Sequence, residues 1–146
     1  MRVDLPSHHL SFDPEGAWLV DEADPKTTEA LGLYLRSVSH GLYLNVRAQG
    51  AGAHPLTADG LRALLREQGW ASPPFDEWTL EPNQDSGPNT IVGGTFETVG
   101  MGGEVVLEVF VTNGTLVANL AGPGAREVIV AVTPAVKRLA MSLRFK

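Results

Sequence analysis

The segment from residue 90 to residue 120 restricts the possible folds of this chain more than any other part of the sequence. It contains Asn113-Gly114, a dipeptide with a strong preference for the two-residue turn of a β-hairpin. A turn of that kind pairs Val111 with Leu116 and Val109 with Ala118. The segment therefore predicts antiparallel strands, and the chain is expected to fold around an antiparallel sheet.

A third strand is predicted upstream of this hairpin. A turn centred on Met101-Gly102 pairs Phe96 with Leu107 and Val92 with Val111. The two hairpins, considered separately, place the same residues of the central strand on one face: Val105, Leu107, Val109 and Val111. This agreement predicts a three-stranded meander, with Gly93 opposite Phe110 on its second face.

Another hairpin is predicted between residues 33 and 47, with His40-Gly41 as its turn. Such a turn pairs Leu35 with Val46 and Ser37 with Leu44. One face is then mostly apolar (Leu33, Leu35, Leu42, Leu44, Val46), and the other has Tyr34, Arg36, Asn45 and Arg47. A shift by one residue would mix the two faces, so the two-residue turn is favoured.

Two helices complete the predicted fold. Thr57 is suited to the N-cap of a helix with an apolar stripe (Leu61, Leu64, Leu65) that ends at Gly69. A second helix is favoured from about 124 to 141, with a strand over 127–132 as the alternative, followed by a terminal strand or tail over 143–145. Short strands are predicted over 2–20 and 77–81, and a loop over 21–30. The prediction is one α+β domain over 1–146, an antiparallel sheet of hairpins and a three-stranded meander packed with two helices.

Charge and composition exclude several classes of protein. The chain has 17 acidic and 11 basic residues, a net charge of −6, which disfavours nucleic acid as a partner. It has no cysteine, so disulfides, thiol catalysis and cysteine-ligated zinc are ruled out. We find neither an apolar leader near Met1 nor an apolar run of membrane-spanning length, and expect a cytoplasmic protein without membrane contact.

Three carboxylates are the strongest candidates for chemistry. In the predicted register Glu97, Glu104 and Glu108 share the second face of the meander, with Thr95 and Asn119 beside Glu108. Glu97 is diagonal to the other two, roughly 7–8 Å away, and carboxylates at about that separation serve hydrolysis or bind a hard cation. The alternative, which we favour, is a solvated sheet face, since one face of an antiparallel sheet often lies in water.

Other catalytic signatures are missing. The four histidines lack the spacing of a zinc helix motif, no nucleophile elbow is present, and Gly122 to Arg126 lacks the residues of a phosphate-binding loop. We therefore predict no catalytic residue, no metal and no cofactor.

Aromatic residues near a double proline are the candidates for partner binding. Trp70, Phe75 and Trp78 flank Pro73-Pro74, and tryptophan is frequent among the residues that dominate binding energy. Core packing is the alternative for this cluster. Phe110 and Val117 join the candidates, because they are apolar positions on the second face of the meander that either a helix or a partner must cover.

The order of elements resembles the PsbP/DcrB-like α/β sandwich fold. The matching pieces are Trp18, the Leu61-Leu64-Leu65 helix, Asn113-Gly114 and the ending Ala140-Met141-Ser142-Leu143-Arg144-Phe145. Members of this fold are mostly accessory proteins: photosystem assembly factors, small lipoproteins and chaperones of secreted effectors. They share no catalytic residues. This chain has no lipobox cysteine, which argues against a lipoprotein role.

Three hypotheses for function follow. The first is a non-catalytic intracellular protein-binding module, such as an adaptor, an effector chaperone or an immunity-type partner, with a protein partner and a possible homodimer. The second is a small hydrolase or metal-dependent enzyme that uses Glu97, Glu104 and Glu108. The third is a carrier of a small ligand held between sheet and helix.

Overall fold

The computed structural model describes residues 2–21, 24–67, 74, 76–82, 87–97 and 104–146. Within these residues the chain forms the elements β1 (Val3–Leu5), η1 (Pro6–His8), β2 (Leu10–Phe12), β3 (Trp18–Asp21), α1 (Pro25–Leu31), β4 (Leu33–Ser37), β5 (Tyr43–Gln49), α2 (Ala58–Glu67), β6 (Asp76–Leu80), β7 (Thr90–Glu97), β8 (Glu104–Thr112), β9 (Val117–Ala125), α3 (Arg126–Ser142) and β10 (Arg144–Phe145). This arrangement confirms the predicted α+β class.

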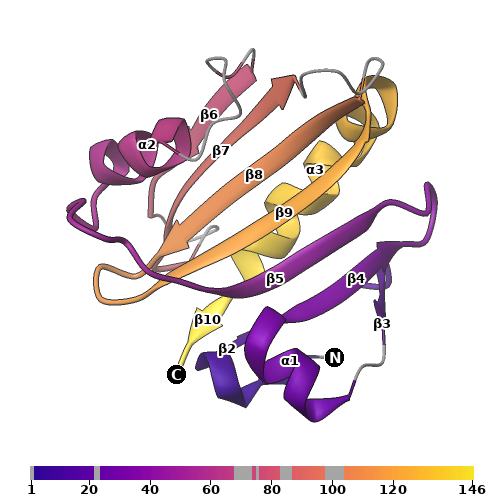
Figure 1. Ribbon diagram of the computed structural model, residues 1–146, viewed down its shortest axis with the longest axis horizontal. Helices are drawn as coiled ribbons and strands as arrows, with labels where there is room; N and C mark the ends of the chain where they lie inside the picture. Colours follow the sequence, from indigo (N-terminus) through magenta and orange to yellow (C-terminus); the bar gives the residue numbers. More distant parts are fainter. Residues whose placement is uncertain (1, 22–23, 68–73, 75, 83–86, 98–103) are drawn as a thin grey trace.

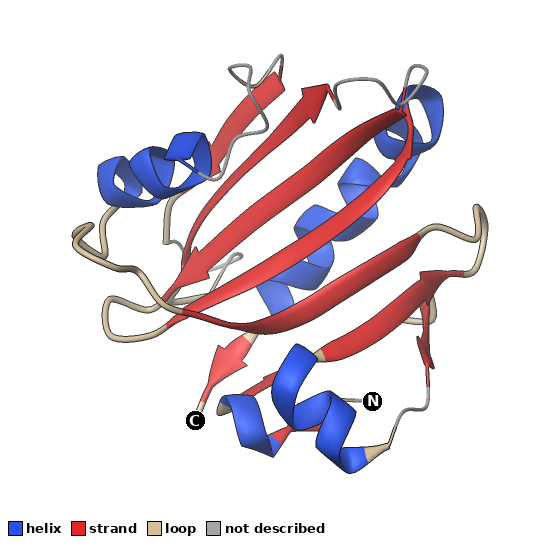
Figure 2. Cartoon of the chain, in the orientation of Figure 1, coloured by secondary structure: helices blue, strands red, loops and turns tan. Residues whose placement is uncertain are grey.

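The architecture is a sandwich around one large antiparallel sheet. Its seven strands run in the order β3-β4-β5-β9-β8-β7-β6, and a small sheet has the order β1-β2-β10. Figure 1 shows α3 behind the large sheet and α1 and α2 in front of it. The sheet separates the helices into two layers, as the colouring in Figure 2 makes clear.

Two apolar clusters lie on opposite faces of the large sheet. The first packs the sheet against α3 and the small sheet, and it includes Leu35, Leu107, Val136 and Phe12. The second packs the sheet against α2 and consists of Leu61, Leu64, Leu65, Val92, Phe96, Phe110 and Val117. We call the face toward α3 the inner face and the face toward α2 the outer face.

The meander is present, but both predicted registers are wrong. Val109 pairs with Leu120 rather than with Ala118, a shift of two residues that keeps the faces. The cause is a longer turn, in which the Asn113 Oδ1 accepts hydrogen bonds from the N–H groups of Thr115 and Leu116, both at 2.9 Å. The side chain of Asn113 thus organises a wider loop than the dipeptide preference predicts.

The register of β7 differs from the prediction by one residue, which exchanges its faces. Thr95 pairs with Leu107, and Gly93 with Val109. Val92 and Phe96 therefore lie on the outer face, where they contact α2. The predicted turn at Met101-Gly102 lies outside the described residues. The four core residues of β8 do share the inner face, as predicted.

The first hairpin also differs by two residues. Leu35 pairs with Leu44, and Leu33 with Val46. Residues 38–42 connect the strands in place of a two-residue turn, and the Ser37 Oγ accepts a hydrogen bond from the N–H of His40 at 3.2 Å. Because the shift is even, the apolar and polar faces remain as predicted.

Both predicted helices are present, and a third helix lies where a loop was predicted. The Thr57 Oγ1 accepts a hydrogen bond from the N–H of Gly60, as expected of an N-cap before α2, while the predicted end at Gly69 lies outside the described residues. The helix α3 and the final strand β10 are also present. The predicted loop over 21–30 is wrong, because α1 begins there with Asp24 as N-cap and Pro25 in its first turn.

Candidate functional site

The three predicted carboxylates do not share a face. Glu97 pairs with Val105 on the inner face and forms an ion pair with Arg126 at the start of α3. Glu108 lies on the outer face, is buried, and accepts a hydrogen bond from the Asn119 Nδ2 at 2.8 Å. The one-residue shift of β7 separates Glu97 from Glu104 and Glu108. Because Thr95 belongs to the same strand, it pairs with Leu107 and does not lie opposite Glu108.

The structure separates the predicted partner-binding residues. Trp70 and Phe75 lie outside the described residues. Trp78 is half-buried on the inner face, where it pairs with Gly93 and where the Lys137 Nζ lies 4.7 Å from its ring centroid. Phe110 and Val117 are buried beneath α2. A helix of the chain itself therefore covers the two apolar positions of the outer face.

The side chain of Trp78 has a clear packing role. A Cβ atom on Gly93 would overlap the indole ring, so glycine at this position lets the ring lie flat on the strand. An aromatic ring does cover a strand glycine, as predicted, but it comes from β6 rather than from Phe110.

A part of the outer face lies beyond α2 and has exposed aromatic side chains. The register places Leu19 opposite Arg36 and Arg36 opposite Tyr43, in one row across β3, β4 and β5. The next row contains Asp21, Tyr34 and Asn45. We call the surface formed by Leu19, Tyr34, Arg36, Tyr43 and Asn45 the open face.

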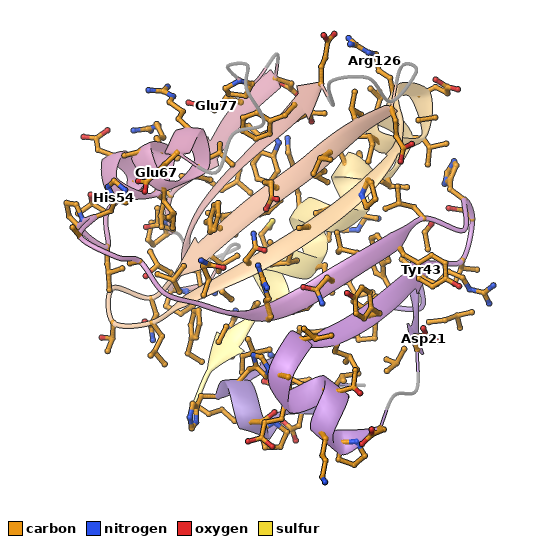
Figure 3. The ribbon with its side chains drawn as sticks, in the orientation of Figure 1. Asp21, Tyr43, His54, Glu67, Glu77 and Arg126 are labelled. Atoms are coloured by element: carbon orange, nitrogen blue, oxygen red, sulfur yellow. The ribbon has the colours of Figure 1, made fainter. Side chains whose placement is uncertain are left out.

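The aromatic and aliphatic side chains of the open face are about half exposed. The exposed fraction is 48% for Leu19, 39% for Tyr34 and 50% for Tyr43. Figure 3 shows Tyr43 and Asp21 at the end of the sheet opposite to that of Glu67 and His54, which are close to α2. The helix that buries Phe110 therefore leaves these tyrosines uncovered.

The backbone of the hairpin presents these side chains outward. On β4 buried and exposed residues alternate strictly, with Leu33, Leu35 and Ser37 inside and Tyr34 and Arg36 outside. The Asn45 Nδ2 donates a hydrogen bond of 2.8 Å to the carbonyl oxygen of Leu31, which holds the end of α1 beside the open face. Leu31 is itself exposed, so it extends the apolar part of this surface.

Charged groups on and beside the open face have no partner among the described residues. None of the described residues forms a hydrogen bond or an ion pair with Arg36 or Asp21, and the Nε atom of Arg47 is buried without an acceptor. Sequence analysis identified the polar face of the hairpin. The unused signal in the sequence is that Tyr34 and Tyr43 lie on that face beside the arginines Arg36 and Arg47.

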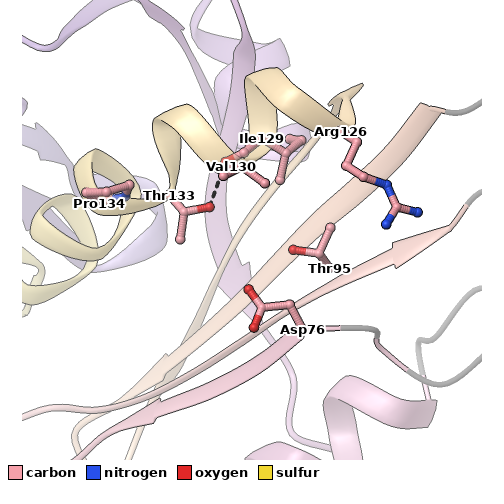
Figure 4. Close-up of a pocket in the computed structure, with 7 residues that line it drawn as sticks. All are labelled: Asp76, Thr95, Arg126, Ile129, Val130, Thr133 and Pro134. Atoms are coloured by element: carbon pink, nitrogen blue, oxygen red, sulfur yellow. Dashed lines mark hydrogen bonds between the residues drawn. The ribbon is translucent and has the colours of Figure 1, made fainter.

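A small cavity lies on the inner face between the first half of α3 and the strands β6 and β7 (Figure 4). It encloses about 230 Å³, less than the ~300–1,000 Å³ typical of pockets for small ligands. Its lining residues are Asp76, Thr95, Arg126, Ile129, Val130, Thr133 and Pro134. Because Pro134 has no N–H, the carbonyl of Val130 lacks its helical donor. The Thr133 hydroxyl donates to the neighbouring carbonyl, that of Ile129, at 2.6 Å and so does not replace that donor.

The one buried histidine has a structural role. The Nδ1 of His8 accepts a hydrogen bond from the N–H of Ala48 at 2.8 Å, and its Nε2 lies 2.9 Å from the carbonyl oxygen of Thr28. One ring nitrogen thus accepts and the other donates, which links η1 to β5 and α1. His54, in contrast, is paired with Glu67 of α2.

Comparison with known proteins confirms the fold. Over its whole length the chain is similar to the solution structure of the cyanobacterial PsbP protein CyanoP from Synechocystis sp. PCC 6803, with a TM-score of 0.62 and 11% sequence identity. The similarity covers 100% of this chain and 92% of that chain. The fold is therefore PsbP-like, as the resemblance predicted. No family model and no curated protein matches the sequence, and none of the described helices is long and apolar enough to cross a membrane.

Proposed function

We propose that the protein is a non-catalytic protein-binding module of the cytoplasm and that the open face is its binding surface. The observation on which the proposal depends is the exposure of Tyr34, Tyr43 and Leu19 in adjacent positions of one sheet face. Scattered apolar residues are normal on a protein surface, but a contiguous group requires an explanation.

The composition of the open face supports this function. Tyrosine and arginine are enriched in protein interfaces, where a ring buries a large area with little loss of side-chain entropy. Arg36 lies between Leu19 and Tyr43 and has no acceptor in the described part of the chain. A partner that buries the rings and supplies a carboxylate near Arg36 satisfies both requirements at once.

The rigidity of the open face also supports the proposed binding function. Leu35 and Leu44, on the reverse side of the same hairpin, are fully buried, so the strands that present the tyrosines are held by the core. A surface that is already ordered loses little conformational entropy when a partner binds. This favours recognition by a flat, preformed face.

Photo-crosslinking in the cells of origin tests the proposal. A photoreactive phenylalanine analogue replaces Tyr34 or Tyr43 in turn, and as a control it replaces Val130, which is 65% exposed on α3 at the inner side of the sheet. We expect one stoichiometric protein adduct from each open-face position and none from Val130.

The variant Tyr43→Thr completes the experiment. Threonine is β-branched and, like tyrosine, suits a strand, and the substitution removes the ring. We expect this variant to lose the partner that the wild-type protein co-purifies, whereas Trp78→Ala retains it if the fold is intact. Equal adducts from all three positions, or a partner retained by Tyr43→Thr and lost by Trp78→Ala, would contradict the open face as the binding surface.

A further inference from the structure

The first strand of the large sheet has an unpaired edge. Within the part of the chain that the structure describes, β3 is terminal and pairs only with β4. The carbonyl of Ala17 accepts a hydrogen bond from the N–H of Val38 at 3.0 Å. Because backbone groups alternate in direction along a strand, those of Leu19 and Asp21 also point to β4, and those of Trp18 and Val20 point away from it. No described residue forms a backbone hydrogen bond to these outward groups.

This edge has few of the features that usually protect a sheet edge. Natural edges are short or contain charged residues, proline or a bulge. The strand β3 (Trp18-Leu19-Val20-Asp21) is short and has one charge, at its end, but it contains no lysine, no proline and no inward charge. Two of its apolar side chains are exposed, Leu19 at 48% and Val20 at 39%. The opposite edge, β6, is different, since it contains Asp76 and the ion-paired Glu77. Among the described residues, β3 is therefore the less protected of the two edges of the large sheet.

We propose that a second copy of this chain pairs with β3 in antiparallel orientation, with Val20 opposite the partner's Val20. A two-fold axis between the two valines makes both strands equivalent, as in most homodimers. Each Val20 then donates its N–H to the carbonyl of the other, and the two large sheets become continuous. The hydrogen bonds of this pairing come from the edge of the sheet, and of the open face only Leu19 and Arg36 adjoin the second copy. Tyr34 and Tyr43 take no part in it, so the pairing is a second interaction beyond the proposed function.

The charges beside the edge agree with this register. With Val20 at the centre, the partner's Asp21 lies opposite Leu19, in the same row as Arg36. Strands in a sheet are ~4.8 Å apart, so the backbone of the partner's Asp21 lies about 10 Å from that of Arg36, within the reach of an arginine side chain. Neither Asp21 nor Arg36 has an ion-pair partner among the described residues.

The second copy fits this edge better than an unrelated peptide. Its own β3 contains both a carboxylate for Arg36, which is Asp21, and an apolar side chain to pack against Val20. The symmetric arrangement forms the Asp21–Arg36 contact twice and places Val20 against an identical apolar side chain. The alternative register, which pairs Val20 with the partner's Trp18, leaves both charges without a partner.

Sedimentation of the full chain over a wide concentration range tests the proposal. We expect the wild type to show a reversible monomer–dimer equilibrium. The variant Val20→Pro removes an outward N–H without removing a bond to β4, and we expect it to raise the dimer dissociation constant by about tenfold or more. Circular dichroism establishes that the variant is folded.

Charge reversal tests the register without altering the backbone. Asp21→Arg and Arg36→Asp should each weaken the dimer by about tenfold, and the double variant should restore wild-type association. Glu81→Arg changes an exposed carboxylate at the end of β6 and should leave the dimer unchanged. These charge variants still test the pairing if Val20→Pro does not fold.

A wild type that stays monomeric, or a dimer insensitive to Val20→Pro, would overturn the pairing. A dimer that Val20→Pro disrupts and charge reversal leaves unchanged would overturn the register. Failure of the proposed function has a separate signature, because it concerns the crosslinks from Tyr34 and Tyr43 and not the oligomeric state.

Discussion

The outer face of the large sheet has two halves that differ in what covers them. Over β7 and β8, α2 contacts Val92, Phe96 and Phe110, and all three are fully buried. Over β3, β4 and β5, Tyr43 and Leu19 stay about half exposed. The strands belong to one sheet and the residues to one face, so secondary structure does not cause the difference.

The difference follows from the side chains that each half offers. The half under α2 presents mainly branched and aromatic groups, and the buried Glu108 of this face accepts a hydrogen bond from Asn119. An amphipathic helix can therefore bury such a surface without an unpaired ion. The other half places Arg36 between Leu19 and Tyr43. An apolar helix would leave this arginine desolvated and unpaired. We infer that the chain closes the first half itself and keeps the second for another molecule.

The largest expected effect is on the covered half. The substitution Phe110→Ala removes a ring that α2 and the sheet enclose completely. We expect the free energy of unfolding to fall by about 3–5 kcal/mol, measured by urea denaturation. A loss below ~1 kcal/mol would mean that α2 does not close this half.

A smaller change in stability tests how α2 packs against Pro55. Alanine in a helix is normally favoured over glycine by about 1 kcal/mol, but a Cβ atom on Gly60 would overlap the backbone carbonyl of Pro55. We therefore expect Gly60→Ala to destabilise the protein by about 1–3 kcal/mol. Gly50→Ala is the matched control, because no atom lies within 4 Å of the added carbon. Increased stability of Gly60→Ala in thermal unfolding would show that α2 does not pack against Pro55.

The smallest effect belongs to the open half. The ring of Tyr43 is half exposed, and threonine suits a strand equally well. We expect Tyr43→Thr to change the free energy of unfolding by no more than about 0.5 kcal/mol. Urea denaturation beside Phe110→Ala gives the direct comparison. A loss close to that of Phe110→Ala would show that both halves belong to the core and would remove the basis of the proposed function.

The candidate site was predictable only in part. The alternation along β4 correctly placed Tyr34 and Arg36 on the face away from the core. The importance of that face was not predictable, because its exposure depends on where α2 lies. The binding residues expected near Pro73-Pro74 illustrate the same limit: Trp78 faces α3, and its contact with Lys137 joins elements far apart in the chain.

The sequence alone determined the class of fold, the central strand and the helices α2 and α3, since each depends on neighbouring residues: an N-cap at Thr57, an apolar stripe, an alternation of side chains. It also determined both faces of the first hairpin, which differ clearly in polarity. Only the tertiary structure decided the register of β7. That strand has apolar side chains on both faces, Ile91 on one and Val92 and Phe96 on the other, so its own pattern permits either orientation. The packing of Val92 and Phe96 against α2 and of Trp78 on Gly93 selects one, and with it the separation of Glu97 from Glu108.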